Sequence, residues 1–203
     1  MRKMLISLAI VLAACGGSDA ADTETPSTDT SSDEVDGSAL AAPTSIPVSD
    51  ISAGHVDPPV SFDQSPSIGG DHYPFWQNCG FYSVELIEGA AAHTMEHGAV
   101  WITYNASSIS DEDLAALEQL AQDNGKLLIS PYAHDEPLVL SAWGVQQRGI
   151  TSVEEPQFME FIDTWVDNPE LAEAGVRCTG AAGVPPDDIR TLADGEQVPE
   201  NYN

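Results

Sequence analysis

Basic residues are scarce in this chain. Its 203 residues include six Lys and Arg against 33 Asp and Glu, and the formal net charge is −27 at pH 7. Affinity for nucleic acid comes mainly from Lys and Arg, so this composition excludes a protein that binds nucleic acid. The same shortage argues against docking on anionic lipid head groups. Cations, including metal ions, are attracted instead, but we favour a solubility device or adaptation to a saline habitat as the reason for the overall charge.

Several signatures of catalysis are also missing. The sequence contains no Gly-rich phosphate-binding loop, no G-x-S-x-G nucleophile elbow and no C-x-x-C pair. Nucleotide binding, serine hydrolysis and dithiol redox chemistry therefore have no support in the sequence.

The apolar run at the N-terminus is too short to span a membrane. Arg2 and Lys3 precede an apolar segment of about eleven residues over 4–14, whereas a spanning helix needs roughly 20. A small-residue cleavage site, Leu12-Ala13-Ala14-Cys15, follows. The pattern resembles a bacterial lipoprotein signal, which implies a signal peptide over 1–14, cleavage before Cys15 and acylation of that cysteine, palmitate included.

The predicted location is therefore extracytoplasmic, on a bacterial envelope membrane that holds the acyl chains of Cys15. More than one acyl chain makes such anchoring stable. An ordinary secretory signal with a chance cysteine is the alternative interpretation.

Composition divides the rest of the chain into three parts. Residues 15–60 are mostly Ser, Thr, Asp, Ala and Pro, and such a segment cannot bury enough apolar surface to fold, so we expect a disordered tether. Residues 61–180 are long enough for one globular domain with a single core. Residues 181–203 are rich in Gly, Pro and acidic residues and predict a loop-rich tail.

Two cysteines remain once Cys15 is assigned to the anchor. An exported chain meets an oxidising compartment in many bacteria, so we expect a disulfide between Cys79 and Cys178. Closing a loop of about 100 residues contributes on the order of 4–5 kcal/mol in the chain-entropy model. A metal-binding Cys79 thiolate near His72, or two free thiols, are the alternatives.

The globular part predicts an α+β fold. Short β-branched and aromatic runs indicate strands over 99–104, 126–130 and 138–143, with a further strand near 81–87. A capping pattern at Ser110 and Asp113 begins one helix, which Asn124-Gly125 ends, and a capping box of Ser152 and Glu155 begins another. This order of elements predicts a small mixed sheet with two main helices packed on one face.

The segment His93-Thr94-Met95-Glu96-His97-Gly98 carries the clearest chemical signal. If it is extended, side chains alternate, and His93, Met95 and His97 share a face that suits copper. If it is helical, His93 and His97 lie one turn apart with Glu96 beside them. The string is then the H-x-x-E-H pattern, with two zinc ligands and a general-base glutamate. The strand-like residues that follow favour the extended form, and Glu173 is one candidate for a distant third ligand of the helical form.

A nearer third ligand is His72, in the turn-rich stretch Gly69-Gly70-Asp71-His72-Tyr73-Pro74. For any single histidine, a hydrogen-bonded structural role is the competing interpretation. His55, at the border of the tether, and His134, in a polar loop, are expected to be solvated residues.

Several of these pieces together resemble the exported bacterial family named domain of unknown function 3105, over roughly residues 65–170. They are the His72 turn, the run from Trp76 to Tyr82, the H-x-x-E-H-G string, Ser130-Pro131-Tyr132 and Ala142-Trp143-Gly144. The resemblance implies that His72, His93, Glu96 and His97 form one site, and it supplies no activity. It also implies an apolar packing role for Met95.

Three functions are consistent with these observations. The first is a lipid-anchored extracytoplasmic domain that binds copper or zinc through His72, His93 and His97. The second is a metal-dependent hydrolase in which Glu96 is the general base. The third is an envelope interaction or structural module without metal, in which the histidines form a hydrogen-bond network.

Overall fold

A six-stranded mixed sheet organises the part of the chain that the structure, a computed structural model, describes, which is residues 40–202. The predicted signal peptide and Cys15 lie outside these residues. The strand order is β1-β6-β5-β3-β4-β2. The strands are β1 (Thr44–Ser45), β2 (Gly80–Phe81), β3 (Val100–Tyr104), β4 (Leu127–Pro131), β5 (Leu138–Ala142) and β6 (Val145–Ile150). β4 runs parallel to both β2 and β3, and the remaining pairs are antiparallel.

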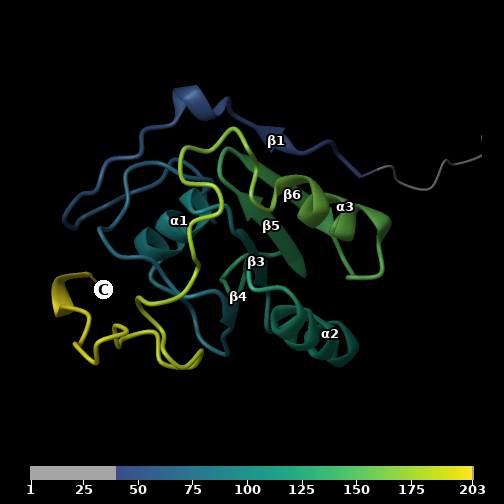
Figure 1. The fold of residues 1–203 in the computed structure, drawn as a ribbon. Coiled ribbons are helices and arrows are strands. Elements are labelled where there is room, and N and C mark those ends of the chain that lie inside the picture. The colour runs from purple at the N-terminus through teal and green to yellow at the C-terminus, as the bar shows by residue number, and fades with distance from the viewer. Residues whose placement is uncertain (1–39, 203) are drawn as a thin grey trace, which may run out of the picture. The chain divides into compact units, whose positions relative to one another are not determined.

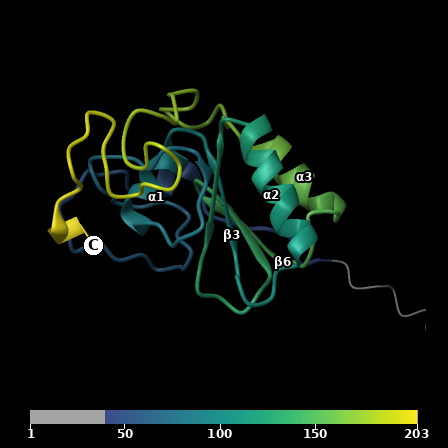
Figure 2. The same cartoon turned by 90° about the horizontal axis from the view of Figure 1, so that it is seen from below.

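Helices cover both faces of this sheet (Figure 1). The helices α2 (Asp111–Asp123) and α3 (Pro156–Trp165) lie together on one face, and α1 (Glu88–Glu96) lies on the other, as Figure 2 shows. The alternation of side chains along β3 explains the division. Val100 and Ile102 belong to the core beneath α2 and α3, whereas Trp101 belongs to the core beneath α1. The predicted α+β fold, with two main helices on one face, is confirmed.

Local sequence signals place most of the regular elements correctly. The Ser110 hydroxyl caps α2 by accepting a hydrogen bond from the Asp113 amide at 3.0 Å, and Asn124 is the C-cap. The predicted capping box of α3 is wrong in detail, because that helix begins after Glu155 and has no side-chain cap. The Ser152 hydroxyl instead donates to Asp113 at 2.8 Å and joins the start of α3 to the start of α2.

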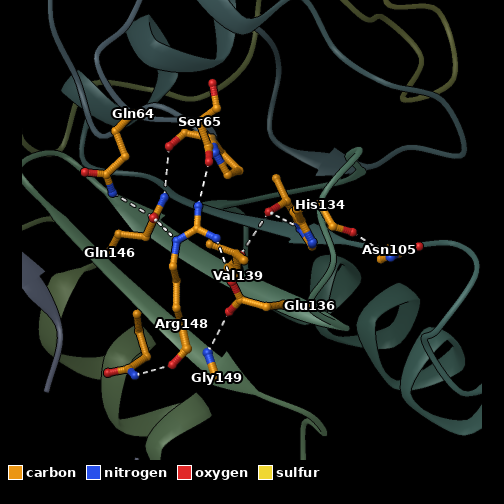
Figure 3. A network of polar contacts seen from close by, with 12 residues as sticks. Gln64, Ser65, Asn105, His134, Glu136, Val139, Gln146, Arg148 and Gly149 are labelled. Carbon is orange, nitrogen blue, oxygen red and sulfur yellow. Dashed lines mark hydrogen bonds and ion pairs between the residues drawn. The ribbon is translucent and has the colours of Figure 1, made fainter. Parts of the chain in front are cut away.

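Strand β6, which no sequence signal predicts, is held by the polar network of Figure 3. The Arg148 guanidinium pairs with Glu136 at 2.6 Å and donates to the Gln146 side chain at 2.7 Å and to the Ser65 carbonyl at 2.5 Å. The Gln146 amide also donates to the Pro66 carbonyl at 2.9 Å. These contacts fix the segment that leads into His72 against the sheet.

The expected tether boundary at residue 60 differs from the structure. Residues 44–45 pair with β6 as β1, and His55 forms a parallel bridge with His72. The bridge consists of hydrogen bonds from the Val56 amide to the His72 carbonyl at 2.8 Å and from the His72 amide to the Gly54 carbonyl at 2.9 Å. Long-range pairing therefore orders a segment whose composition alone predicts no structure.

The C-terminal residues contain little regular structure apart from the 3-10 helix η2 (Glu200–Tyr202). Another 3-10 turn, η1 (Val48–Asp50), lies near β1 in the sequence. Ala182, Val198 and Tyr202 are nevertheless buried against Tyr73 and Ala90. The predicted disulfide between Cys79 and Cys178 is confirmed. In residues 40–202, no helix has the length and apolar character needed to cross a membrane.

Candidate metal centre

The H-x-x-E-H segment is helical, so the preference for an extended conformation is wrong. Helix α1 includes His93 in its last turn, and His97 is the C-cap. Ala90, Ala91 and Ala92 favour the helix, and Gly98 ends it with a positive φ of 89°. A side chain at Gly98 would also meet the Asp167 carboxylate at 2.7 Å. Helix α1 therefore ends at Glu96, with His97 as its C-cap and Gly98 after it, and the apolar strand β3 begins at Val100.

The helical conformation separates Met95 from the histidines. Met95 is fully buried in the cluster that contains Trp101 and Leu128. The structure therefore places Met95 in the core, in agreement with the packing role that the family resemblance implies, and not beside His93 as an extended segment would.

Three imidazole rings meet at one point. The ring centroids of His72 and His93 are 4.6 Å apart, and that of His55 lies 5.1 Å from the first and 4.7 Å from the second. His72 and His93 are buried, whereas His55 is exposed. The backbone bridge between residues 55 and 72 brings the rings of His55 and His72 together, and helix α1 contributes the ring of His93.

Backbone carbonyls fix the orientation of two of these rings. The Nδ1 atom of His72 donates to the Gly70 carbonyl at 2.8 Å, and that of His93 donates to the Tyr73 carbonyl at 2.7 Å. A carbonyl can only accept, so each Nδ1 atom carries a proton, and in a neutral ring the lone pair on Nε2 is then the one available to a metal ion. Histidine ligands of metal ions are oriented by this kind of outer hydrogen bond.

A carboxylate completes the first group of possible ligands. Oε2 of Glu96 lies 3.1 Å from Nε2 of His72, and this buried nitrogen has no other hydrogen-bond partner in the described part of the chain. One ligand atom from each of His55, His72, His93 and Glu96 lies within 4.8 Å of the others. We call these four residues the inner group.

A second group shares His93 and adds His97 and Glu173. The ligand atoms of this outer group also lie within 4.8 Å of one another, and Nε2 of His97 is 3.3 Å from Oε2 of Glu173. Lys126 links the end of α1 to the loop that carries Glu173, because its ammonium donates to the His97 carbonyl at 2.8 Å and to the Val176 carbonyl at 2.7 Å. The outer group is therefore built from the end of α1 and the loop that follows α3.

The pKa values of His93, His97 and Glu96 are shifted toward the forms that metal ions bind. Burial lowers the pKa of His93 to about 4, with smaller contributions from the neighbouring histidines, although the hydrogen bond to Tyr73 opposes the shift. Burial also lowers the pKa of His97, and Glu173 opposes that shift. Burial alone would raise the pKa of Glu96, but His72 and the other histidines outweigh it and the net shift is downward. Neutral imidazoles and a carboxylate are the protonation states required for coordination.

Two tryptophans surround the histidines. The Trp76 ring centroid lies 5.0 Å from that of His97 and 5.7 Å from that of His93, and the Trp143 ring meets His72 edge-on at 5.7 Å. Such an apolar surround limits water around the polar atoms and strengthens electrostatic interactions there.

Comparison with known proteins identifies the family. The model of the family described as "Protein of unknown function (DUF3105)" matches residues 55–180. The chain belongs to this family. No curated protein and no solved structure matches it.

For this DUF3105 domain, the sequence identifies most of the candidate site. His72, His93 and Glu96 meet in the inner group, while His97 faces Glu173 in the outer one. His55, expected to be a solvated residue, is a member of the inner group that the sequence did not predict. Its signal would have been the family match itself, which begins at residue 55.

Two remaining candidates of this DUF3105 domain lie elsewhere. Cys79 is bonded to Cys178 and is not available as a thiolate ligand. His134 belongs to neither group of possible ligands, and Nε2 of its ring contacts the Thr103 hydroxyl at 3.1 Å, within the network of Figure 3.

Proposed function

We propose that this chain is a lipid-anchored extracytoplasmic domain that binds one transition-metal ion, copper or zinc, through His55, His72, His93 and Glu96. The observation that carries the proposal is the convergence of three imidazoles and a carboxylate within 4.8 Å, with two of the rings oriented by backbone carbonyls. Three nitrogens and one oxygen form a donor set that suits Zn²⁺ or Cu²⁺ better than Mg²⁺ or Ca²⁺.

The buried nitrogen of His72 favours a metal site over a purely structural network. Buried polar atoms are almost always hydrogen-bonded, and each exception calls for an explanation. Apart from the contact with Oε2 of Glu96 at 3.1 Å, the buried Nε2 of His72 has no hydrogen-bond partner within the described residues. A metal ion between these atoms would satisfy both.

The test is the metal content of the purified full-length chain after exposure to Zn²⁺ or Cu²⁺ and removal of the excess. We expect one tightly held ion in the unmodified protein and loss of that ion in the double variant His72→Ala/His93→Ala. The matched control His134→Ala should keep the ion. A folded, unmodified chain that binds neither metal would leave the structural module as the better assignment.

Membrane attachment through Cys15 is the second part of the proposal. The lipoprotein-type signal supports it, and the disulfide is consistent with an oxidising compartment. In a bacterial host, the unmodified chain should fractionate with membranes, and Cys15→Ala should appear in the soluble exported fraction. Equal membrane association of both forms would count against acylation at this position.

One observation favours hydrolysis as a second candidate. His93 in the last turn of α1 and His97 at its C-cap lie one turn apart, and Glu173 would be the third ligand that the H-x-x-E-H pattern requires. Glu96 would then be the general base that activates a metal-bound water. If this is so, the zinc-loaded chain should hydrolyse p-nitrophenyl acetate, and Glu96→Gln should abolish turnover while the histidines retain the metal. Absence of turnover in the unmodified, zinc-loaded chain would favour the metal-binding function.

A further inference from the structure

We propose that the bound ion has two alternative positions around His93, and that the outer group, His93 with His97 and Glu173, is where it is loaded and released. This inference rests on the proposed metal-binding function and adds the route by which the ion is exchanged.

His93 has a single nitrogen to offer. Its Nδ1 donates to the Tyr73 carbonyl, so only Nε2 remains for a metal ion. The ring lies between the two groups, since its centroid is 4.6 Å from that of His72 on one side and 4.8 Å from that of His97 on the other. One lone pair binds one ion, so the inner and outer positions are filled in alternation.

The ligands on the two sides do not form a single set. The inner group contains His72 and the outer group contains His97, and within the described residues no single group of mutually close ligand atoms contains both. An ion that moves between the positions therefore exchanges ligands. His72, His55 and Glu96 replace His97 and Glu173 one bond at a time while Nε2 of His93 stays attached. Each metal–ligand bond that breaks is replaced by one that forms, and the oxidation state of the ion does not change.

The two positions differ in the number of ligands that they offer. The inner one offers three imidazoles and a carboxylate; the side chains of His72 and Glu96 are only 0% and 14% exposed, whereas His55 is exposed. The outer one offers two imidazoles and the Glu173 carboxylate, whose side chain is 45% exposed. A position with fewer ligands beside a position with more ligands is the arrangement expected for stepwise loading.

Anchoring of the outer group matches this role. Lys126 ties the His97 carbonyl to the Val176 carbonyl and pairs with Asp167 at 2.7 Å, so Glu173 lies on a short loop pinned near its end. The disulfide at Cys178 pins the same loop to the segment that carries Trp76. The carboxylate thus faces solvent from a fixed place, from which it can take an ion and present it to His97.

The competing route is through His55, the exposed member of the inner group. The two routes differ in which residues control the rate. Loading through the outer group makes the rate sensitive to Glu173 and His97, whereas direct loading makes it sensitive to His55 alone.

The experiment measures the rate of Cu²⁺ loading by stopped-flow quenching of tryptophan fluorescence in the full-length chain. Release is measured by transfer of the ion to EDTA. We expect Glu173→Gln and His97→Ala to slow both processes by about tenfold while the equilibrium affinity changes by less than about threefold. Glu170→Gln, an exposed carboxylate on the same loop, and His134→Ala are the matched controls and should leave the rates unchanged.

Stoichiometry and spectroscopy complete the test. The unmodified chain should bind one Cu²⁺ with about three coordinated nitrogens in its electron paramagnetic resonance spectrum. In His72→Ala the ion should remain but more weakly, with about two nitrogens, as the outer position requires. Rates that do not respond to Glu173 and His97, or two ions per chain, would overturn the two-position inference and leave the metal site in place. A folded chain that binds no Cu²⁺ at all would overturn both.

Discussion

His93 connects nearly every feature of the site, and its burial has a measurable consequence for stability. Its pKa in the folded chain is about 4, below the ordinary value of 6.5. Between these values the unfolded chain binds the proton and the folded chain does not, so the free energy of unfolding falls as the pH falls through this window. The full shift corresponds to on the order of 3 kcal/mol.

We therefore predict that metal-free protein loses stability between pH 6.5 and about 4, and that His93→Gln reduces this loss. Urea unfolding at several pH values measures the slope for each form. His55→Gln, which changes an exposed ring in the same cluster, is the control and should retain the slope. Identical slopes in the unmodified and His93→Gln chains would show that the proton is not excluded from this ring.

Among the possible metal ligands, the sequence predicts those whose signal is local and misses those that depend on long-range pairing. His93 and Glu96 occur in one short pattern, and His72 lies in a turn-rich stretch that precedes this pattern in the sequence. His55 meets them only through a backbone bridge to His72, and such a long-range pairing has no local signal. The division of His72 and His97 into separate groups likewise depends on how α1 packs.

Among the elements, α1 shows why local preference can mislead. The strand residues of β3 follow the motif so closely that they favour an extended form upstream as well. The alanines before His93 favour a helical conformation, and the positive φ at Gly98 ends the helix. Packing against Trp101 buries Met95. By contrast, α2 and β3 were predictable because their caps and apolar patterns are complete within the segment.

The end of α1 depends on Lys126, and this dependence gives a second prediction. The ammonium group bonds two backbone carbonyls and the Asp167 carboxylate, and the side chain is only 17% exposed. Lys126→Met keeps the apolar stem but leaves these acceptors without their partner. We expect a loss of about 2 kcal/mol in the free energy of unfolding.

Urea unfolding of the metal-free chain checks this value, with Arg190→Met as the control. Arg190 is an exposed basic residue, so its removal changes the net charge equally and should alter stability by no more than about 0.5 kcal/mol. If both variants lose the same stability, the effect comes from net charge and not from the contacts of Lys126 between the end of α1 and the loop that carries Glu173.

For the whole molecule, the pattern of success follows the distance between partners in the sequence. Composition and patterning predicted an α+β domain, and the cysteine count predicted the disulfide. Strands β1 and β6 are missed because β1 has two residues and β6 is polar, with its Gln and Arg side chains paired to distant segments (Figure 3). These two strands depend on contacts between segments that are far apart in the sequence, so a local sequence pattern does not indicate them.

The acidity of the whole chain acts on the site through long-range attraction. A formal charge of −27 raises the local concentration of cations, and salt screens this effect over distances of about 10 Å at 0.1 M ionic strength. We predict that the bimolecular rate of Cu²⁺ loading falls by about tenfold between about 10 mM and 500 mM NaCl. Removal by EDTA involves an anion and should change in the opposite direction, since salt weakens the repulsion between EDTA and the chain. A loading rate that is independent of salt would mean that the acidic surface serves solubility alone and that local ligands control the capture of the ion.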